Sequence, residues 1–130
     1  LFDSVETVKN CLHVFADMVP TIKANKDNMY QSALKGYTTA TDLADYLVKK
    51  GLAFRDAHEV VGKAVSYGLK ENKDLSEFTI DELKNFNSLI EKDVFDVISL
   101  EGSINARNHL GGTSPKQISI AIKKGRKSIK

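Results

Sequence analysis

The stretch TATDLADYLVKKG, residues 39–51, predicts a helix whose beginning and end are both marked in the sequence. Thr39 is followed at the third position by Asp42, which resembles a capping box with Asp in place of Glu. Gly51 is expected to end the helix, because glycine is the residue that most often follows the last helical residue. The apolar residues between these markers recur at helical spacing: Leu43, Leu47 and Val48. An amphipathic helix of this kind needs other helices to cover its apolar face.

A longer helix is predicted before this stretch, from the start of the chain to about Met18. Apolar residues there alternate at steps of four and three: Leu1, Val5, Val8, Leu12, Phe15, Val19 and Ile22. The apolar surface is wider than a two-stranded seam and suits a multi-helix bundle, so Cys11 is expected to be a small buried side chain. Pro20 would clash with the carbonyl of Ala16 in a continuing helix, so residues 20–24 are expected to be extended.

Capping signals predict further helices. Asn25 can cap a short helix that runs to about Lys35 and stops at Gly36. Thr79 and Glu82 form a complete capping box, which predicts a helix to about residue 90. Further helix or turn starts are predicted at Asp93, Ser99 and Ser114.

Two more helices are predicted, over residues 54–70 and after Pro115. Gly62 in the first of them is interpreted as a point of close contact between helices. The last helix has isoleucines near helical spacing, and the lysines after Gly125 are expected to fray into solvent. No convincing strand pattern occurs, so we predict an all-α fold. Residues 1–36 would be the end of a long bundle helix with a connector, and residues 37–130 a small multi-helix C-terminal domain.

Composition bounds the functional classes. The 130 residues are 42% hydrophobic, enough for one compact core, and the net charge of +2 selects no class of partner. A single cysteine cannot form an internal disulfide, which fits a reducing cytoplasm, and no apolar run approaches the length of a membrane span. Residues 115–130 hold six basic side chains and no acid. No aromatic residue interleaves them, so neither nucleic acid nor a membrane surface is favoured as a partner.

Few side chains suggest chemistry. His13, His58 and His109 lie on separate predicted elements and lack metal-ligand spacing, so no metal is expected. Arg107 and the amides up to Gly112 could cradle an anion, although a turn that enters a helix explains the two glycines equally well. No nucleotide-binding or nucleophile motif is present in the sequence.

Three stretches resemble the C-terminal region of argininosuccinate lyases, in the superfamily of fumarase and aspartase. They are TATDLADYLVKKG at 39–51, FRDAHEVVG at 54–62 and SLEGSINARNHLGGT at 99–113. The resemblance implies a parent enzyme that cleaves argininosuccinate to arginine and fumarate by β-elimination in arginine biosynthesis. It further implies a cytoplasmic homotetramer that assembles through its helical bundle and needs no cofactor.

The superfamily's catalytic signature, G-S-S-x-M-P-x-K-x-N, does not occur in these 130 residues. We therefore predict no catalytic, substrate-binding, cofactor-binding or metal-binding residue in this chain, and we expect the piece alone to be inactive. Because the chain opens without Met inside a helical pattern, its natural start is expected to lie upstream. Two alternatives stay open: an autonomous helical interaction module with a basic tail, and a crystallin-like relative without catalytic function.

Overall fold

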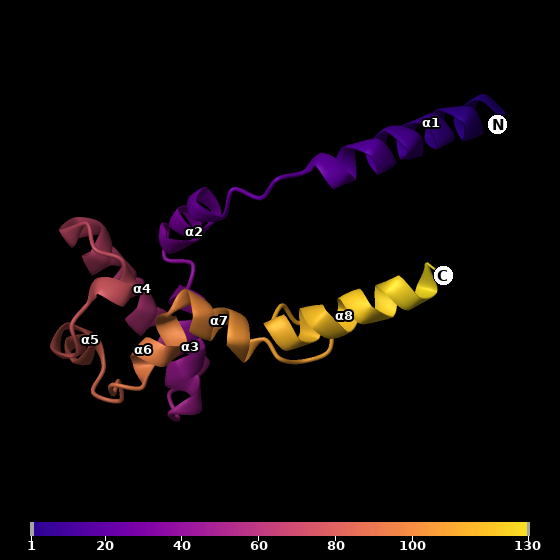
Figure 1. Ribbon diagram of the computed structural model, residues 1–130. Helices are drawn as coiled ribbons and strands as arrows, with labels where there is room; N and C mark the ends of the chain where they lie inside the picture. Colours follow the sequence, from indigo (N-terminus) through magenta and orange to yellow (C-terminus); the bar gives the residue numbers. More distant parts are fainter. Residues whose placement is uncertain (1, 130) are drawn as a thin grey trace. The chain divides into compact units, whose positions relative to one another are not determined.

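The computed structural model describes residues 2–129, and every regular element within that range is helical (Figure 1). The all-α prediction is therefore confirmed. Leu1, the first position of the apolar stripe, and Lys130, the last basic residue of the tail, lie outside the described residues. The chain divides into two compact units, Leu1–Ser32 and Ala33–Lys130. Within residues 2–129, no helix combines the length and the apolar character needed to cross a lipid bilayer.

The first helix ends where the sequence predicts, but the segment after it differs. The elements are α1 (Phe2–Met18), the 3-10 helix η1 (Val19–Thr21) and α2 (Lys26–Leu34). The expected extended conformation is wrong for the start of residues 20–24, because Pro20 lies in the first turn of η1, where its missing N–H is tolerated. The Thr21 hydroxyl also donates to the Met18 carbonyl at 2.7 Å.

Both markers of the short second helix are confirmed. The backbone amide of Asn28 donates to the Asn25 side-chain oxygen at 3.1 Å, which is the predicted N-terminal cap of α2. Gly36 follows the end of α2 with a φ of +87°, a conformation that favours glycine.

The apolar stripe of α1 is exposed in the described chain, and no residue of this helix is buried. Cys11 is exposed, so the prediction that it is a buried side chain is wrong. That prediction assumed a bundle around α1. The next two elements, η1 and α2, hold no buried residue either.

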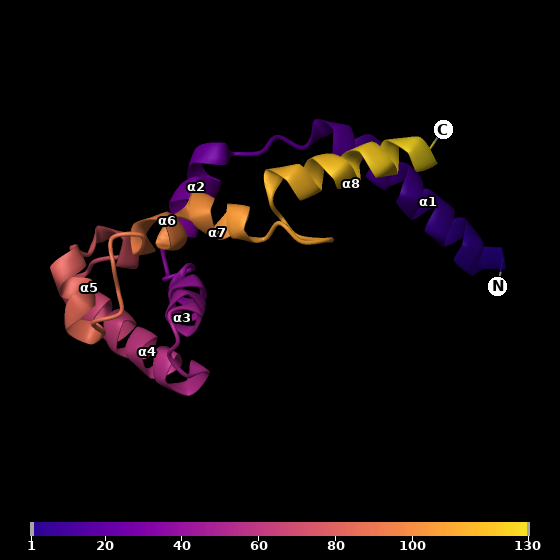
Figure 2. The ribbon, with the colours of Figure 1, turned by 90° about the horizontal axis from the view of Figure 1, so that it is seen from below.

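The second unit is built around α3 (Ala40–Lys49), which packs against α4 and α6 (Figures 1 and 2). The other elements in chain order are α4 (Phe54–Glu71), η2 (Leu75–Glu77), α5 (Ile80–Phe86), α6 (Val94–Ile98), α7 (Leu100–Ala106) and α8 (Pro115–Ser128). The seven largest fully buried side chains are Leu43, Leu47, Leu75, Leu83, Ile90, Val94 and Ile98. They come from four helical elements and one loop, and α4 adds the buried Ala57 and Ala64, so the core closes only when the whole stretch from α3 to α6 is folded.

The helix opened by Thr79 begins as predicted and ends earlier. The Thr79 hydroxyl accepts from the Glu82 amide while the Glu82 carboxylate accepts from the Thr79 amide, so the capping box is complete. The helix stops at Phe86 and not near residue 90, because Asn87 is extended and its side-chain oxygen accepts from the Leu89 amide at 2.9 Å.

The glycine at a close contact in α4 is Gly68 and not Gly62, so that interpretation is wrong. An ideal Cβ at Gly62 would meet nothing within 4 Å. A Cβ at Gly68 would lie 2.6 Å from the Lys73 carbonyl oxygen and 2.8 Å from the Tyr37 hydroxyl oxygen. Gly68 lets the chain after α4 fold back against the helix.

The predicted start of α8 is confirmed, and the predicted fraying is wrong. Ser114 caps the helix through its hydroxyl, which accepts from the Gln117 amide, and Pro115 takes the first turn. The helix continues through Gly125 to Ser128. A single exposed glycine costs only about 1 kcal/mol, and the basic residues of the last turn favour the negative end of the helix dipole.

Candidate functional site

A cluster of three polar side chains joins the first and the last of the sequence stretches quoted above. We call Asp42, Ser103 and Arg107 the Asp42 cluster. The Ser103 hydroxyl donates to Oδ2 of Asp42 at 2.7 Å, and Nη1 of Arg107 lies 3.2 Å from Oδ1. Arg107 also donates to the hydroxyl of Ser103 at 2.6 Å and to its backbone carbonyl. The Asp42 side chain is 8% exposed and that of Arg107 41%, so a nearly buried carboxylate is neutralised by a half-exposed cation.

The cluster replaces the capping box predicted at the start of α3, which is wrong. Thr39 makes no side-chain capping bond, because its backbone, with φ −93° and ψ 7°, is not in the extended conformation that N-capping requires. Asp42 binds Ser103 and Arg107 on and beside α7 instead. The carboxylate therefore connects two helices and does not cap its own.

Backbone hydrogen bonds also hold the connector between α7 and α8 in place. The Ser114 amide donates to the Arg107 carbonyl at 3.3 Å, and the Gly112 amide to the His109 carbonyl at 2.8 Å. A Cβ at Gly112 would lie only 2.0 Å from the Arg107 carbonyl oxygen, so this position requires glycine. Both Arg107 and the glycines are engaged within the protein, which favours the turn interpretation over an anion cradle.

A second network holds the end of α3 to the loop before α6. The Tyr46 hydroxyl donates to Oδ1 of Asp93 at 2.5 Å and accepts from the Glu91 amide at 3.1 Å. Nζ of Lys50 lies 2.5 Å from Glu91 and 3.1 Å from Asp93. Burial and the bond to Asp93 raise the pKa of Tyr46, while the Tyr46 hydroxyl and then Lys50 lower the pKa of Asp93. These groups are paired with one another, as expected of a structural network.

A third network surrounds Glu82 at the start of α5. Hydrogen bonds from the Thr79 amide and from Lys73, whose Nζ lies 3.0 Å away, lower the pKa of Glu82 to about 2. The Tyr37 hydroxyl donates to the Lys73 carbonyl at 3.0 Å, which ties the beginning of this unit to the same corner. Three aromatic rings pack edge to face or stacked beside it: Tyr67, Phe78 and Phe86.

The histidines lie apart, as their sequence positions suggest. His13 is on α1, His58 on α4 and His109 in the connector before α8. Among residues 2–129 no three His, Cys, Asp or Glu side chains gather in a way that could hold a metal ion. Beside His58, Glu59 pairs with Lys63 at 2.7 Å, and this pairing lowers the pKa of Glu59.

One open groove of about 720 Å³ lies between α7 and α8, and we call it the α7–α8 groove. It is lined by apolar and by polar or basic side chains. We call the apolar ones the groove floor (Ile104, Pro115, Ile118 and Ile122) and the polar or basic ones the groove edge (Thr113, Ser119, Lys123 and Arg126). The sequence analysis assigned no role to this surface, although the spacing of Ile118 and Ile122 places them on one helix face. The contribution of Ile104 could not be read from spacing, since it depends on the turn between the two helices.

The helices and networks described here define an all-helical packing unit, and its fold is similar to that of a known lyase. The solved structure of a variant of EDDS lyase with bound fumarate matches 80% of this chain and 23% of that chain, with a TM-score of 0.73. At 24% identity, the likeness extends to the fold alone.

A family model identifies the family to which the packed core belongs. The model of the family described as argininosuccinate lyase C-terminal matches residues 37–105. This range begins at Tyr37 and ends one residue before the last residue of α7. The chain belongs to this family, and the resemblance noted in the sequence is confirmed.

Curated relatives match essentially the whole chain. It is 65% identical over 130 residues to argininosuccinate lyase of Ruthia magnifica, 27% of that protein. It is 58% identical over 129 residues to argininosuccinate lyase of Saccharophagus degradans and 57% identical over 129 residues to that of Nitrosococcus oceani, 28% of each. The chain thus spans little more than a quarter of the length of these relatives.

Proposed function

We propose that this chain is the C-terminal structural part of an argininosuccinate lyase subunit. The whole subunit would cleave argininosuccinate to arginine and fumarate by β-elimination, as one step of arginine biosynthesis. The observation that carries this proposal is the match over 129–130 residues to relatives named argininosuccinate lyase, at identities of 55–65%. The all-helical fold, which is similar to that of a lyase, agrees with this proposal.

The reaction needs a base for a proton beside a carboxylate, an acid for the departing nitrogen and cations that hold the carboxylates. In this chain the buried carboxylate is paired with Arg107 and Ser103, and the networks around Tyr46 and Glu82 are equally occupied with one another. We therefore propose that no residue of this chain is catalytic or binds substrate by itself. Its work in the subunit is to hold a rigid helical platform.

The proposed domain assignment keeps residues 1–36 as the end of the central helical-bundle domain with its connector. Residues 37–130 are then the small C-terminal domain. The exposed stripe of α1, which includes Val5, Val8 and Leu12, is the surface expected of a bundle helix seen without its neighbours. On this basis we propose a cytoplasmic homotetramer that assembles through the bundle.

An assay of two proteins tests the proposal. The complete subunit that contains this chain and the 130-residue chain alone are each supplied with argininosuccinate, and fumarate is followed by its absorbance. The subunit is expected to form fumarate, and the chain alone is expected to form none. A complete subunit that leaves argininosuccinate intact contradicts the proposed activity, whereas fumarate formed by the chain alone contradicts the proposal that its residues are not catalytic.

Assembly is tested on the same complete subunit. Light scattering is expected to give four times the subunit mass, as the family resemblance implies. A stable monomer or dimer that still forms fumarate would contradict the tetramer and leave the proposed reaction standing.

A further inference from the structure

Helix α8 carries three isoleucines of nearly equal exposure on two different faces. Ile118, Ile120 and Ile122 are 46%, 49% and 50% exposed. Ile118 and Ile122 are four positions apart, so they lie on one face, and both line the α7–α8 groove. Ile120 is two positions from each and points to a different side of the helix, outside the groove lining. Only one of the two apolar surfaces of α8 is therefore shaped to receive another side chain.

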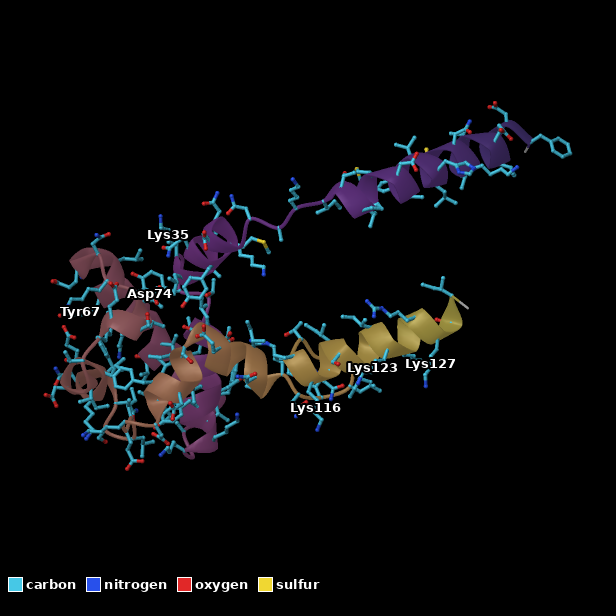
Figure 3. The ribbon with its side chains drawn as sticks, in the orientation of Figure 1. Lys35, Tyr67, Asp74, Lys116, Lys123 and Lys127 are labelled. Atoms are coloured by element: carbon cyan, nitrogen blue, oxygen red, sulfur yellow. The ribbon has the colours of Figure 1, made fainter. Side chains whose placement is uncertain are left out.

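The charge around the groove has a single sign. Helix α8 contains five basic residues and no acidic one. Arg126 and Lys123 line the groove edge. Figure 3 shows Lys123 on the same side of α8 as Lys116 and Lys127, two lysines that do not line the groove. An occupant of this groove would meet an apolar floor beside guanidinium and ammonium groups, so it needs an apolar ridge flanked by carboxylates.

We propose that the α7–α8 groove receives an amphipathic helix from the part of the same subunit that lies outside these 130 residues. This inference rests on the proposed function, since it takes the chain to be part of a longer lyase subunit. The chain spans 27% of the length of argininosuccinate lyase of Ruthia magnifica. In a subunit of that length, most of the helices that could occupy the groove lie outside these 130 residues. A segment of the same polypeptide is present at high effective concentration, which favours it over a separate protein.

A second copy of the chain suits the groove less well. A two-fold contact of α8 with α8 would bring the same surface together twice and set Arg126 and Lys123 beside their own equivalents. Like charges placed together across an interface oppose association. An acidic flank from another part of the subunit removes this repulsion and pairs the same two cations.

Matched variants of the complete subunit test the inference. Ile118→Asp places a carboxylate in the groove floor, and Ile120→Asp makes the same change at equal exposure outside the groove. We expect Ile118→Asp to lower the thermal midpoint of the subunit by several degrees and Ile120→Asp to leave it within about a degree. Arg126→Glu at the groove edge and Lys127→Glu outside it form a second pair, with the larger loss again expected at the groove.

The same variants in the 130-residue chain separate the possible occupants. Because both isoleucines are half exposed there, neither change should alter the helical circular dichroism or the mass measured by light scattering. Equal effects of Ile118→Asp and Ile120→Asp in the subunit would overturn the inference. A change of mass that Ile118→Asp alone causes in the isolated chain would overturn it in favour of a second copy. The thermal midpoint is measured without substrate, so a failure of the proposed lyase activity would not be mistaken for a failure of this inference.

Discussion

Helices α3 and α8 are both amphipathic, yet α3 is half buried and α8 is not buried at all. Five of the ten residues of α3 are buried, whereas α8 has fourteen residues and none of them is buried. The apolar face of α3 meets α4 and α6, and its carboxylate Asp42 is paired with Arg107. An apolar stripe thus predicts that a helix face is buried against another surface. It does not predict whether that surface belongs to the same 130 residues.

The largest expected effect separates the two helices directly. Leu47→Ala in α3 removes a fully buried side chain and should lower the free energy of unfolding of the 130-residue chain by about 2–5 kcal/mol. Ile122→Ala in α8 removes a half-exposed side chain and should cost less than about 1 kcal/mol. Urea denaturation with an unchanged slope measures both values. Equal losses would show that α8 is as much part of the core as α3.

The Asp42 cluster provides the next comparison, between two aspartates on the same helix. Asp42→Ala removes the acceptor of the Ser103 hydroxyl and the ion-pair partner of the Arg107 guanidinium, and it is expected to cost about 2 kcal/mol. Asp45→Ala changes an exposed aspartate of α3 and should stay within about 0.5 kcal/mol.

A double-mutant cycle of Asp42→Ala with Arg107→Ala sharpens this prediction. A shared network should make the double variant less destabilised than the sum of the two single losses. Additive losses in urea denaturation would mean that the two side chains act independently, against the contact described here.

Two glycines of α4 are expected to respond with opposite signs. Gly68→Ala would place a Cβ against the Lys73 carbonyl and the Tyr37 hydroxyl, so we expect a loss of about 1–3 kcal/mol. Gly62→Ala meets open space and should stabilise the helix by about 0.4–1 kcal/mol. Thermal unfolding of the two variants beside the unaltered chain measures the contrast. A stabilising Gly68→Ala would contradict the tight turn after α4.

The smallest effect is a pH dependence that arises at Glu82, at the start of α5. The pKa of Glu82 falls from its ordinary value of 4.5 to about 2 in the folded chain. A lowered folded pKa contributes stability above pH 4.5, and this contribution is lost as the pH falls towards 2. Glu82→Gln should therefore destabilise the chain near neutral pH and make little difference at about pH 2. A variant whose urea midpoint differs from the parent by the same amount at both pH values would contradict this assignment.

Local features of the fold could be predicted from the sequence because their partners are close in the chain. The caps at Asn25, Thr79 and Ser114 each use a side chain and an amide three residues apart. The glycines at positions 36 and 51 have the positive φ expected of helix ends. Such signals depend on a few neighbouring residues and survive folding unchanged.

Features that depend on distant residues could not be predicted. Asp42 is 61 residues from Ser103, and this contact overrides the local capping role that its spacing suggests. Gly62 and Gly68 both lie within α4, and the approach of Lys73 and Tyr37 decides which of them is crowded. The α7–α8 groove likewise depends on a turn that brings Ile104 towards α8.

We propose that the core from α3 to α6 is complete within this chain, while α1 and α8 hold surfaces for the rest of a lyase subunit. Amide hydrogen exchange compared between the 130-residue chain and the complete subunit tests it most directly. We expect the amides of α1 and α8 to exchange more slowly in the subunit, while those in the middle of α3 change least. Unchanged exchange in α1 and α8 would contradict it.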